Sequence, residues 1–331
     1  MQSSFRTLHL ALASSVAVAF IVSAYVFSGP FSFRPSTVDA ATAESLLKAY
    51  ATKDSDTDGL PDWQESLYGT DPANPESVQT GVKDGDAVAQ GLIKPKFASA
   101  ANPNSDDGEG NGKTVADDTL TAEFARDFFT QYFSTYSNQT QPTEDQINSF
   151  TESAVQELVA KNQYEPTISA SSLTVSGSGA LALTAYLASV ESALSKNTVP
   201  TSKSELDYMD DSIQRNDTSG LVQVRSIAKA YTAMGTAVSK VAVPAEAKEA
   251  HLALSNAMIH MGTVINHMGA SDTDPIRSLL GLMLYQDAAI RLSDSLESLY
   301  QVLQTNGVLL QEGDPGYSVY KTAKYSASRI K

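Results

Sequence analysis

Apolar side chains in the C-terminal part of the chain recur at alternating steps of three and four residues. This spacing places them on one face of an α-helix. Two series follow it, namely Val224, Ile227, Tyr231, Met234, Val238 and Val241, and then Leu282, Tyr285, Ala289, Leu292, Leu296, Leu299 and Leu303. A helix from Pro244 to about Met268 lies between them, and Asp274-Pro275 opens the last helix, which Gly307 ends. The pattern predicts an antiparallel helical bundle.

The helical periodicity begins further upstream, at residue 119. The segment TLTAEFARDFFTQYFSTY carries its aromatic residues at helix spacing, and Thr143 with Gln146 forms a capping box that opens a helix to about Lys161. Residues 165–179 break the helical pattern and have room for one short strand, and helices are predicted again over 180–196 and 204–214. We therefore assign residues 119–310 to the bundle and the protein to the mainly α class.

Near the N-terminus the apolar positions form one continuous run. From Leu8 to Phe27 the chain reads LHLALASSVAVAFIVSAYVF, without Asp, Glu, Lys or Arg. A helix of about 20 residues spans the hydrocarbon core of a membrane. Because Arg6 precedes the run, residues 1–33 are predicted to be an N-terminal membrane anchor, with Leu8–Phe27 as a transmembrane helix in the cytoplasmic membrane and the C-terminal portion extracytoplasmic. A cleaved signal peptide is the alternative, although its best cleavage motif, Val38-Asp39-Ala40, lies far beyond the apolar run.

The composition narrows the classes of function. The 331 residues include 23 Lys and Arg against 38 Asp and Glu, and the formal net charge is -15. This acidity argues against a nucleic-acid partner, because phosphate binding needs concentrated Lys and Arg, and it favours the attraction of cations. The chain has no cysteine, so disulfides, Cys-ligated zinc and thiol catalysis are excluded.

A twelve-residue stretch, DSDTDGLPDWQE (Asp54–Glu65), matches the template of a calcium-binding loop. Alternate acids at positions 1, 3 and 5 converge on one point, while Gly59 at position 6 turns the backbone. A solvated acidic turn is the plainer alternative, but such turns seldom fill all five carboxylate positions and the glycine. The predicted Ca²⁺ ligands are Asp54, Asp56, Asp58, the carbonyl of Leu60, Asp62 and Glu65.

The flanking residues complete a helix–loop–helix unit. Ala43–Ala51 is predicted to form the entering helix, and Trp63–Tyr68 the exiting helix, which Gly69 stops. Pro61 suits the first turn of the exiting helix. It stands at position 8 and has no N–H to pair with a second loop, so a paired two-loop arrangement is disfavoured. Residues 34–93 are predicted to form this calcium-binding unit.

A weaker copy of the loop follows. With Gly81 aligned to the turn glycine, the acid positions hold Glu76, Val78, Thr80 and Asp84, and Ala87 replaces the closing Glu. The stretch Asp54–Asp86 resembles thrombospondin type 3 and related bacterial calcium repeats, of the form D-x-D-x-D-G-L-x-D-x-x-E followed by G-T-D-P. The second repeat is decayed, so a second full site is not expected. Whether Glu76 or Asp84 lends an oxygen to the first loop stays open.

The remaining segments carry weaker signals. Residues 94–118 are rich in Gly, Asn, Asp and Ala, which is typical of a flexible linker, and residues 311–331 form a basic tail that we expect to be solvated. His260 and His267 lie seven positions apart on one helix face, too far to share a metal, so we interpret them as flanking a core of methionines. We find no catalytic motif and expect no enzyme activity.

The whole layout resembles a group of membrane-anchored surface proteins of ultrasmall, candidate-phylum bacteria. The shared marks are the N-terminal span, DTDGLPDWQESLYGTDP, TLTAEFARDFFTQYF and the last two helices, which end in LQTNG. This resemblance implies an extracytoplasmic protein associated with a secretion or pilus apparatus. We therefore predict a calcium-binding structural or interaction protein whose bundle contacts a protein partner. The alternatives are an extracytoplasmic ligand-binding sensor domain and a wall-active enzyme.

Overall fold

The computed structural model describes residues 19–22, 35–38, 49–50, 52–90, 92–93, 119–127, 144–215 and 217–328. The described chain is mainly helical, as predicted. It forms two compact units. The loop unit comprises Leu47–Gln163 and Ala270–Leu280, and the helical unit comprises Met1–Leu46, Tyr164–Gly269 and Gly281–Lys331.

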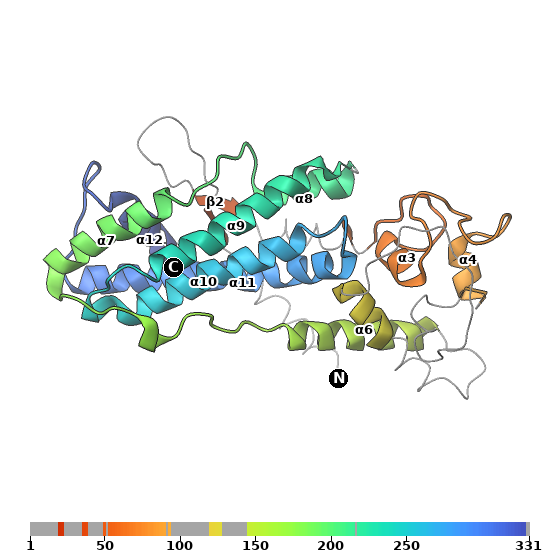
Figure 1. Cartoon of the computed structure of the whole chain (residues 1–331), viewed down its shortest axis with the longest axis horizontal. Helices are drawn as coiled ribbons and strands as arrows, with labels where there is room; N and C mark the ends of the chain where they lie inside the picture. The colour runs from red at the N-terminus through yellow and green to blue at the C-terminus, as the bar shows by residue number, and fades with distance from the viewer. Residues whose placement is uncertain are drawn as a thin grey trace, which may run out of the picture. The chain divides into compact units, whose positions relative to one another are not determined.

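The loop unit combines short and longer helices within its described residues. Its helices are α3 (Asp62–Tyr68), α4 (Asp84–Ala89), a helical segment over 120–127, α6 (Glu144–Lys161) and the first turns of α11 (Pro275–Thr305) (Figure 1). The α3 helix ends where predicted, because Gly69 adopts the left-handed conformation (φ 74°) and its N–H donates to the carbonyl of Glu65. The predicted linker over 94–118 lies outside the described residues.

Asp274 holds the segment at 120–127 inside the loop unit. Its carboxylate accepts the N–H groups of Leu120 and Thr121, both at 2.9 Å, and also the Thr121 hydroxyl at 2.7 Å. Arg277 donates to the same carboxylate at 2.8 Å. The described residues 119–127 and α6, which the sequence pattern grouped with the bundle, belong to the same compact unit as the loops. Long-range hydrogen bonds of this kind leave no trace in helical periodicity.

The helical unit is built from six helices of the described chain. They are α7 (Gly179–Ser195), α8 (Glu205–Gln214), α9 (Leu221–Val238), α10 (Lys248–Met268), the remainder of α11 and α12 (Tyr317–Ser328). Three single-turn 3₁₀ helices join or precede them, at Ala170–Ser172, Thr218–Gly220 and Ala245–Ala247. The bounds of α7, α8, α10 and α11 agree with the sequence-based predictions to within a few residues.

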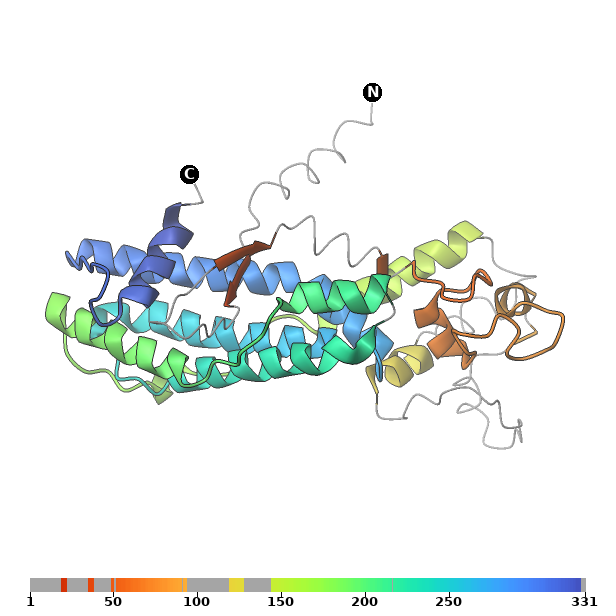
Figure 2. The same ribbon diagram turned by 90° about the horizontal axis from the view of Figure 1, so that it is seen from above.

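Close approach of backbones defines the centre of the helical unit. Helices α9 and α10 lie side by side along their length (Figure 1, Figure 2). A Cβ atom at Gly235 would lie 2.7 Å from the carbonyl oxygen of Ser255, and one at Gly262 would lie 2.7 Å from that of Ala228. Glycine is therefore required at both contacts. The predicted apolar faces are buried around this contact, including Met258, Met261, Ile265 and Met268.

The expectation of a solvated C-terminal tail is wrong for residues 317–328. These residues form α12, which packs on α7 and buries Val319, Tyr320 and Ala323. Glu191 of α7 accepts backbone N–H groups at the start of α12, from Gly316 at 2.6 Å and from Ser318 at 3.1 Å. A carboxylate at a helix N-terminus is stabilised by the helix dipole. The four basic residues after position 314 make the segment polar overall, although its apolar residues share one helix face.

Most of the predicted transmembrane helix lies outside the described residues. Its four described residues form the strand β1 (Ala19–Val22), which pairs antiparallel with β2 (Pro35–Val38) in the register Ala19 with Val38. The sequence AFIV suits a strand as well as a helix, because aromatic and β-branched residues favour extended backbone. Within the described ranges, none of the helices combines the length and the apolar character that a membrane span requires.

Candidate metal centre

The first loop is shaped by the carboxylate of Asp54. One of its oxygens accepts the N–H of Thr57 at 2.8 Å, and the other accepts the N–H of Gly59 at 3.0 Å. The backbone turns at Thr57 (φ 63°) and at Gly59 (φ 96°). Because Gly59 has no Cβ, it adopts this conformation at little cost, which explains its place at position 6 of the template.

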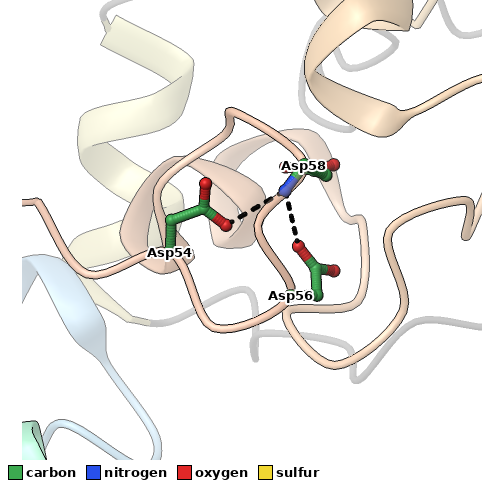
Figure 3. Close-up of side chains that lie close together, drawn as sticks. All are labelled: Asp54, Asp56 and Asp58. Carbon is green, nitrogen blue, oxygen red and sulfur yellow. Dashed lines mark hydrogen bonds between the residues drawn. The ribbon is translucent and has the colours of Figure 1, made fainter.

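Three of the predicted ligands converge inside this turn. Oxygen atoms of Asp54, Asp56 and Asp58 all lie within 4.8 Å of one another. The N–H of Asp58 donates to Asp54 and to Asp56, both at 3.3 Å, so the turn folds the two carboxylates toward the same backbone group (Figure 3). Asp58 itself accepts the N–H of Leu60 at 2.7 Å. Alternate positions of the loop thus present their oxygens to one volume.

Glu65 is the most deeply buried of the predicted ligands. It lies in the first turns of α3, where its N–H donates to the carbonyl of Pro61 at 3.0 Å, and its side chain is 0% exposed. The hydroxyl of Thr70 donates to Oε1 at 3.2 Å, but Oε2 has no hydrogen-bond partner among the described residues. Oδ2 of Asp56 is buried and unpartnered in the same way. Buried carboxylate oxygens normally have a donor or a cation beside them.

Asp62 is not brought together with the other predicted ligands. Its two oxygens accept the N–H and the hydroxyl of Ser55, each at 2.8 Å, and Lys53 forms an ion pair with it at 3.4 Å. These contacts fasten the start of the loop to the start of α3. The side chain of Asp62 is therefore satisfied by hydrogen bonds and a cation without any metal.

The second loop repeats this frame. Gly81 is also left-handed (φ 86°), and its N–H donates to Glu76 at 2.7 Å, as Gly59 donates to Asp54. Helix α4 then starts as α3 does, because its N-cap residue Lys83 has the extended conformation (φ -62°, ψ 142°) that Pro61 has (φ -60°, ψ 144°). The loss of acids has left the backbone of the second loop intact.

The acids at position 9, Asp62 in the first loop and Asp84 in the second, make the same hydrogen bonds in both loops. Asp84 accepts the N–H of Ser77 at 3.0 Å as well as its hydroxyl, and Asp62 does the same for Ser55. The N–H groups of the two acids close the loops by donating to the carbonyls of Pro75 and Lys53, at 3.0 and 2.8 Å. The two loops thus share a design position by position.

Asp84 also joins a second acidic group, which the loop template does not contain. Oxygen atoms of Asp58, Glu65 and Asp84 lie within 4.8 Å of one another, and all three residues are buried. Glu76 is exposed and belongs to neither group. The only sequence signal for Asp84 is its match to position 9 of the second repeat. The contact with Asp58 and Glu65 depends on how the two loops pack.

Comparison with known proteins adds no relative. No family model, no curated protein and no solved structure matches the chain. The interpretation of this site therefore rests on the geometry of its residues and on the loop motif.

The electrostatics of the site favour a cation. Burial, followed by the charge of Asp56, raises the pKa of Glu65 to about 8. Burial, followed by the charge of Asp58, raises the pKa of Asp56 to about 6. Two like charges within 4.8 Å of each other repel by roughly 3.5 kcal/mol at an effective dielectric constant of about 20. A divalent cation would remove this repulsion and ionise both groups.

Other candidate sites in the described residues lack such a convergence of ligands. His251 is buried and hydrogen-bonded to the Tyr186 hydroxyl at 3.0 Å, and His260 packs edge-on against the ring of Tyr164. Neither belongs to a group of described residues that could hold a metal. An open groove between α9 and α10 is lined by small residues with Lys229 and Asn266, and no carboxylate lines it.

Glu205 is an instructive contrast to Glu65. It is also fully buried, and its burial raises its pKa to about 7. Its Oε1 accepts the hydroxyl of Tyr285 at 2.9 Å. No other acid of the described residues lies close enough to Glu205 to complete a metal-binding group. Oε2 of Glu205 also lacks a hydrogen-bond partner among the described residues, so the convergence of acids at Glu65 is what sets the loops apart.

Proposed function

We propose that the protein binds Ca²⁺ through its first loop and acts as an extracytoplasmic structural or interaction protein. The observation that carries this proposal is the buried Glu65 carboxylate, whose Oε2 has no hydrogen-bond partner among the described residues although oxygens of Asp58 and Asp84 lie within 4.8 Å of a Glu65 oxygen. An oxygen in this position is stabilised by a metal ion or by a proton. The converging carboxylates of Asp54, Asp56 and Asp58 favour the ion.

The chemistry of the ligands favours calcium over other metals. Every candidate ligand is an oxygen atom, and the chain has no cysteine. Soft and borderline metals prefer sulfur and imidazole, whereas Ca²⁺ takes six to eight oxygens in flexible geometry. Magnesium prefers a smaller octahedral shell that keeps several waters, which suits a crowded carboxylate cage less well.

The position of the loop in the chain suggests what calcium does. The apolar run from Leu8 to Phe27 has the composition of a membrane anchor, and along the sequence the loop lies between this run and the helices that begin at Gly179. Calcium would order the intervening segment, so that the anchored protein presents its helices to a protein partner outside the cytoplasmic membrane, in keeping with a secretion or pilus apparatus. An affinity on the order of 10⁻⁵ to 10⁻³ M suits this setting.

Calorimetric titration tests the proposal. The full-length chain, kept in detergent micelles because of its apolar run, is expected to bind Ca²⁺ saturably. The Glu65→Gln variant keeps the shape of the side chain and removes its charge, so its affinity should fall by roughly 100-fold or more. The matched control is Glu76→Gln, which changes an exposed acid of the second loop and should leave binding unchanged. Absence of binding by the unmodified chain at millimolar Ca²⁺ would contradict the proposal.

A further inference from the structure

Asp84 and Asp62 occupy the same position of the two loops but differ in their surroundings. Asp62 is paired with Lys53 and is partly exposed. Asp84 is 0% exposed, and its oxygen lies within 4.8 Å of oxygens of Asp58 and Glu65. Its hydrogen-bond donors are the N–H groups of Ser77 and Val78 and the Ser77 hydroxyl, none of which carries a charge.

No basic side chain of the described residues neutralises this group. The ion pairs among them involve other acids, and Lys83, the nearest base in sequence, donates instead to the carbonyl of Thr57 at 2.8 Å. Three buried carboxylates therefore lie close together, and Oε2 of Glu65 has no donor among the described residues. Such a group needs a cation or bound protons.

The two loops are in direct contact at this point. The N–H of Gly85, next to Asp84, donates to the second oxygen of Asp58 at 3.1 Å. A Cβ atom at position 85 would lie 2.7 Å from the carbonyl oxygen of Asp58, so only glycine allows this approach. The first loop has Trp63 at the equivalent position. Gly85, which differs from Trp63 at the same position of the first loop, thus allows the second loop to pack against the first.

We propose that Asp84 is a ligand of the Ca²⁺ ion held by Asp58 and Glu65, so that one ion joins the two loops. The inference rests on the proposed function, since it names a further ligand of the same site. Asp84 takes the place that the loop template gives to Asp62, whose oxygens are occupied by Ser55 and Lys53. The second repeat has lost a site of its own and completes the site of the first.

A pair of matched variants tests this assignment by calorimetry on the full-length chain. Asp84→Asn and Asp62→Asn each keep an oxygen that can accept from the serine of their loop. We expect Asp84→Asn to lower the Ca²⁺ affinity by at least about tenfold and Asp62→Asn by less than about threefold. Equal affinities of Asp84→Asn and the unmodified chain would overturn the inference while leaving the proposed function in place. Failure of the unmodified chain to bind would overturn both.

A second variant covers the case in which Asp84→Asn does not fold. Gly85→Ala keeps every carboxylate but forces the second loop away from Asp58, and we expect it to weaken Ca²⁺ binding by a similar factor. Hydrogen exchange of the calcium-bound chain gives an independent readout. Calcium should slow exchange at the amides of Gly81 and Gly85 in the second loop, as well as at Gly59. Protection confined to the first loop would overturn the shared site.

Discussion

The loops Asp54–Glu65 and Glu76–Ala87 have one backbone design and two different charge patterns. Both turn at a left-handed glycine and both are fastened by a position-9 acid that binds a serine. Of the two loops, only the first has three alternate acids whose oxygens converge, and its Asp58 also lies close to the buried Glu65. The second loop keeps this backbone without the alternate acids, so hydrogen bonds alone can maintain such a loop. The additional acids of the first loop also accept backbone N–H groups, but the unpartnered oxygens of Asp56 and Glu65 among the described residues are what a bound cation would explain.

The largest expected difference between the loops concerns their alternate acids. Asp56→Asn removes a charge whose Oδ2 has no protein partner, and should weaken Ca²⁺ binding by roughly 30- to 150-fold, equivalent to about 2–3 kcal/mol. The matching change, Val78→Asn in the second loop, alters an exposed side chain and should change the affinity less than about twofold. Calorimetric titration of both variants measures the difference, and equal effects would remove the distinction between the loops.

The next largest effect is the dependence of binding on pH. Without calcium, Glu65 has a pKa of about 8 and Asp56 a pKa of about 6, so both retain protons that the ion must displace. The Ca²⁺ affinity should rise with pH by up to about tenfold per unit between pH 6 and 8 and level off above this range. A calorimetric series in buffers of different ionisation enthalpy would detect the released protons, and an affinity independent of pH would contradict the raised pKa values.

The same pKa shifts predict a change in stability without calcium. Because both folded-state pKa values are raised, the folded protein binds more protons than the unfolded chain between about pH 4 and 8. The free energy of unfolding of the loop unit should therefore fall as the pH rises through this range. Saturating calcium should abolish the fall, which thermal unfolding at several pH values would show.

A smaller contrast is expected from the two turn glycines. Gly59→Ala and Gly81→Ala each place a Cβ at positive φ without a steric contact, so both should destabilise their loops by about 1–2 kcal/mol. Gly59→Ala should weaken calcium binding by roughly fivefold, because its loop supplies most of the ligands, and Gly81→Ala should weaken it less, because its loop supplies only Asp84. Paired unfolding and binding measurements separate the two effects. A comparable loss of affinity in Gly81→Ala would show that the second loop contributes more than Asp84.

The smallest effect is a gain of binding in the second loop. Val78→Asp with Thr80→Asp restores the alternate acids at exposed positions of an intact frame. We expect a weak second binding event, with a dissociation constant near 10⁻³ M, because Ala87 still supplies no closing carboxylate. The control is the doubly Asn-substituted chain, which should bind as the unmodified chain does. Strong binding to the double Asp variant would show that the closing glutamate is dispensable.

Much of the helical architecture could be predicted from the sequence, because apolar spacing, capping residues and glycine stops act locally. Helix α8 begins at the capping box of Ser204 and Asp207, and α11 begins at Pro275. The grouping of residues 119–163 with the loops could not be predicted, because it depends on Asp274 and its distant partners. The packing of α12 was missed because its basic residues outweighed a short apolar stripe.

The candidate site was predictable only as far as the template extends. Asp54, Asp56, Asp58 and Glu65 were found because one twelve-residue loop contains them. The template also included Asp62, whose carboxylate accepts a hydrogen bond from Ser55 and forms an ion pair with Lys53. Asp84 belongs to the second loop, and it can lie close to Asp58 only because the neighbouring Gly85 has no Cβ. Contacts between repeats are a property of packing, which a linear motif does not encode.

The most direct test of a cation held by the loops uses the single tryptophan of the chain. Trp63 lies in α3 between Asp62 and Glu65 and is buried. Terbium(III) prefers the same hard oxygen ligands as calcium, and its emission is sensitised only by an aromatic ring close to it. With excitation at the red edge of the tryptophan band, we expect sensitised emission that excess Ca²⁺ abolishes and that Glu65→Gln lacks. Emission that is absent, or that calcium does not displace, would contradict a calcium site at these loops.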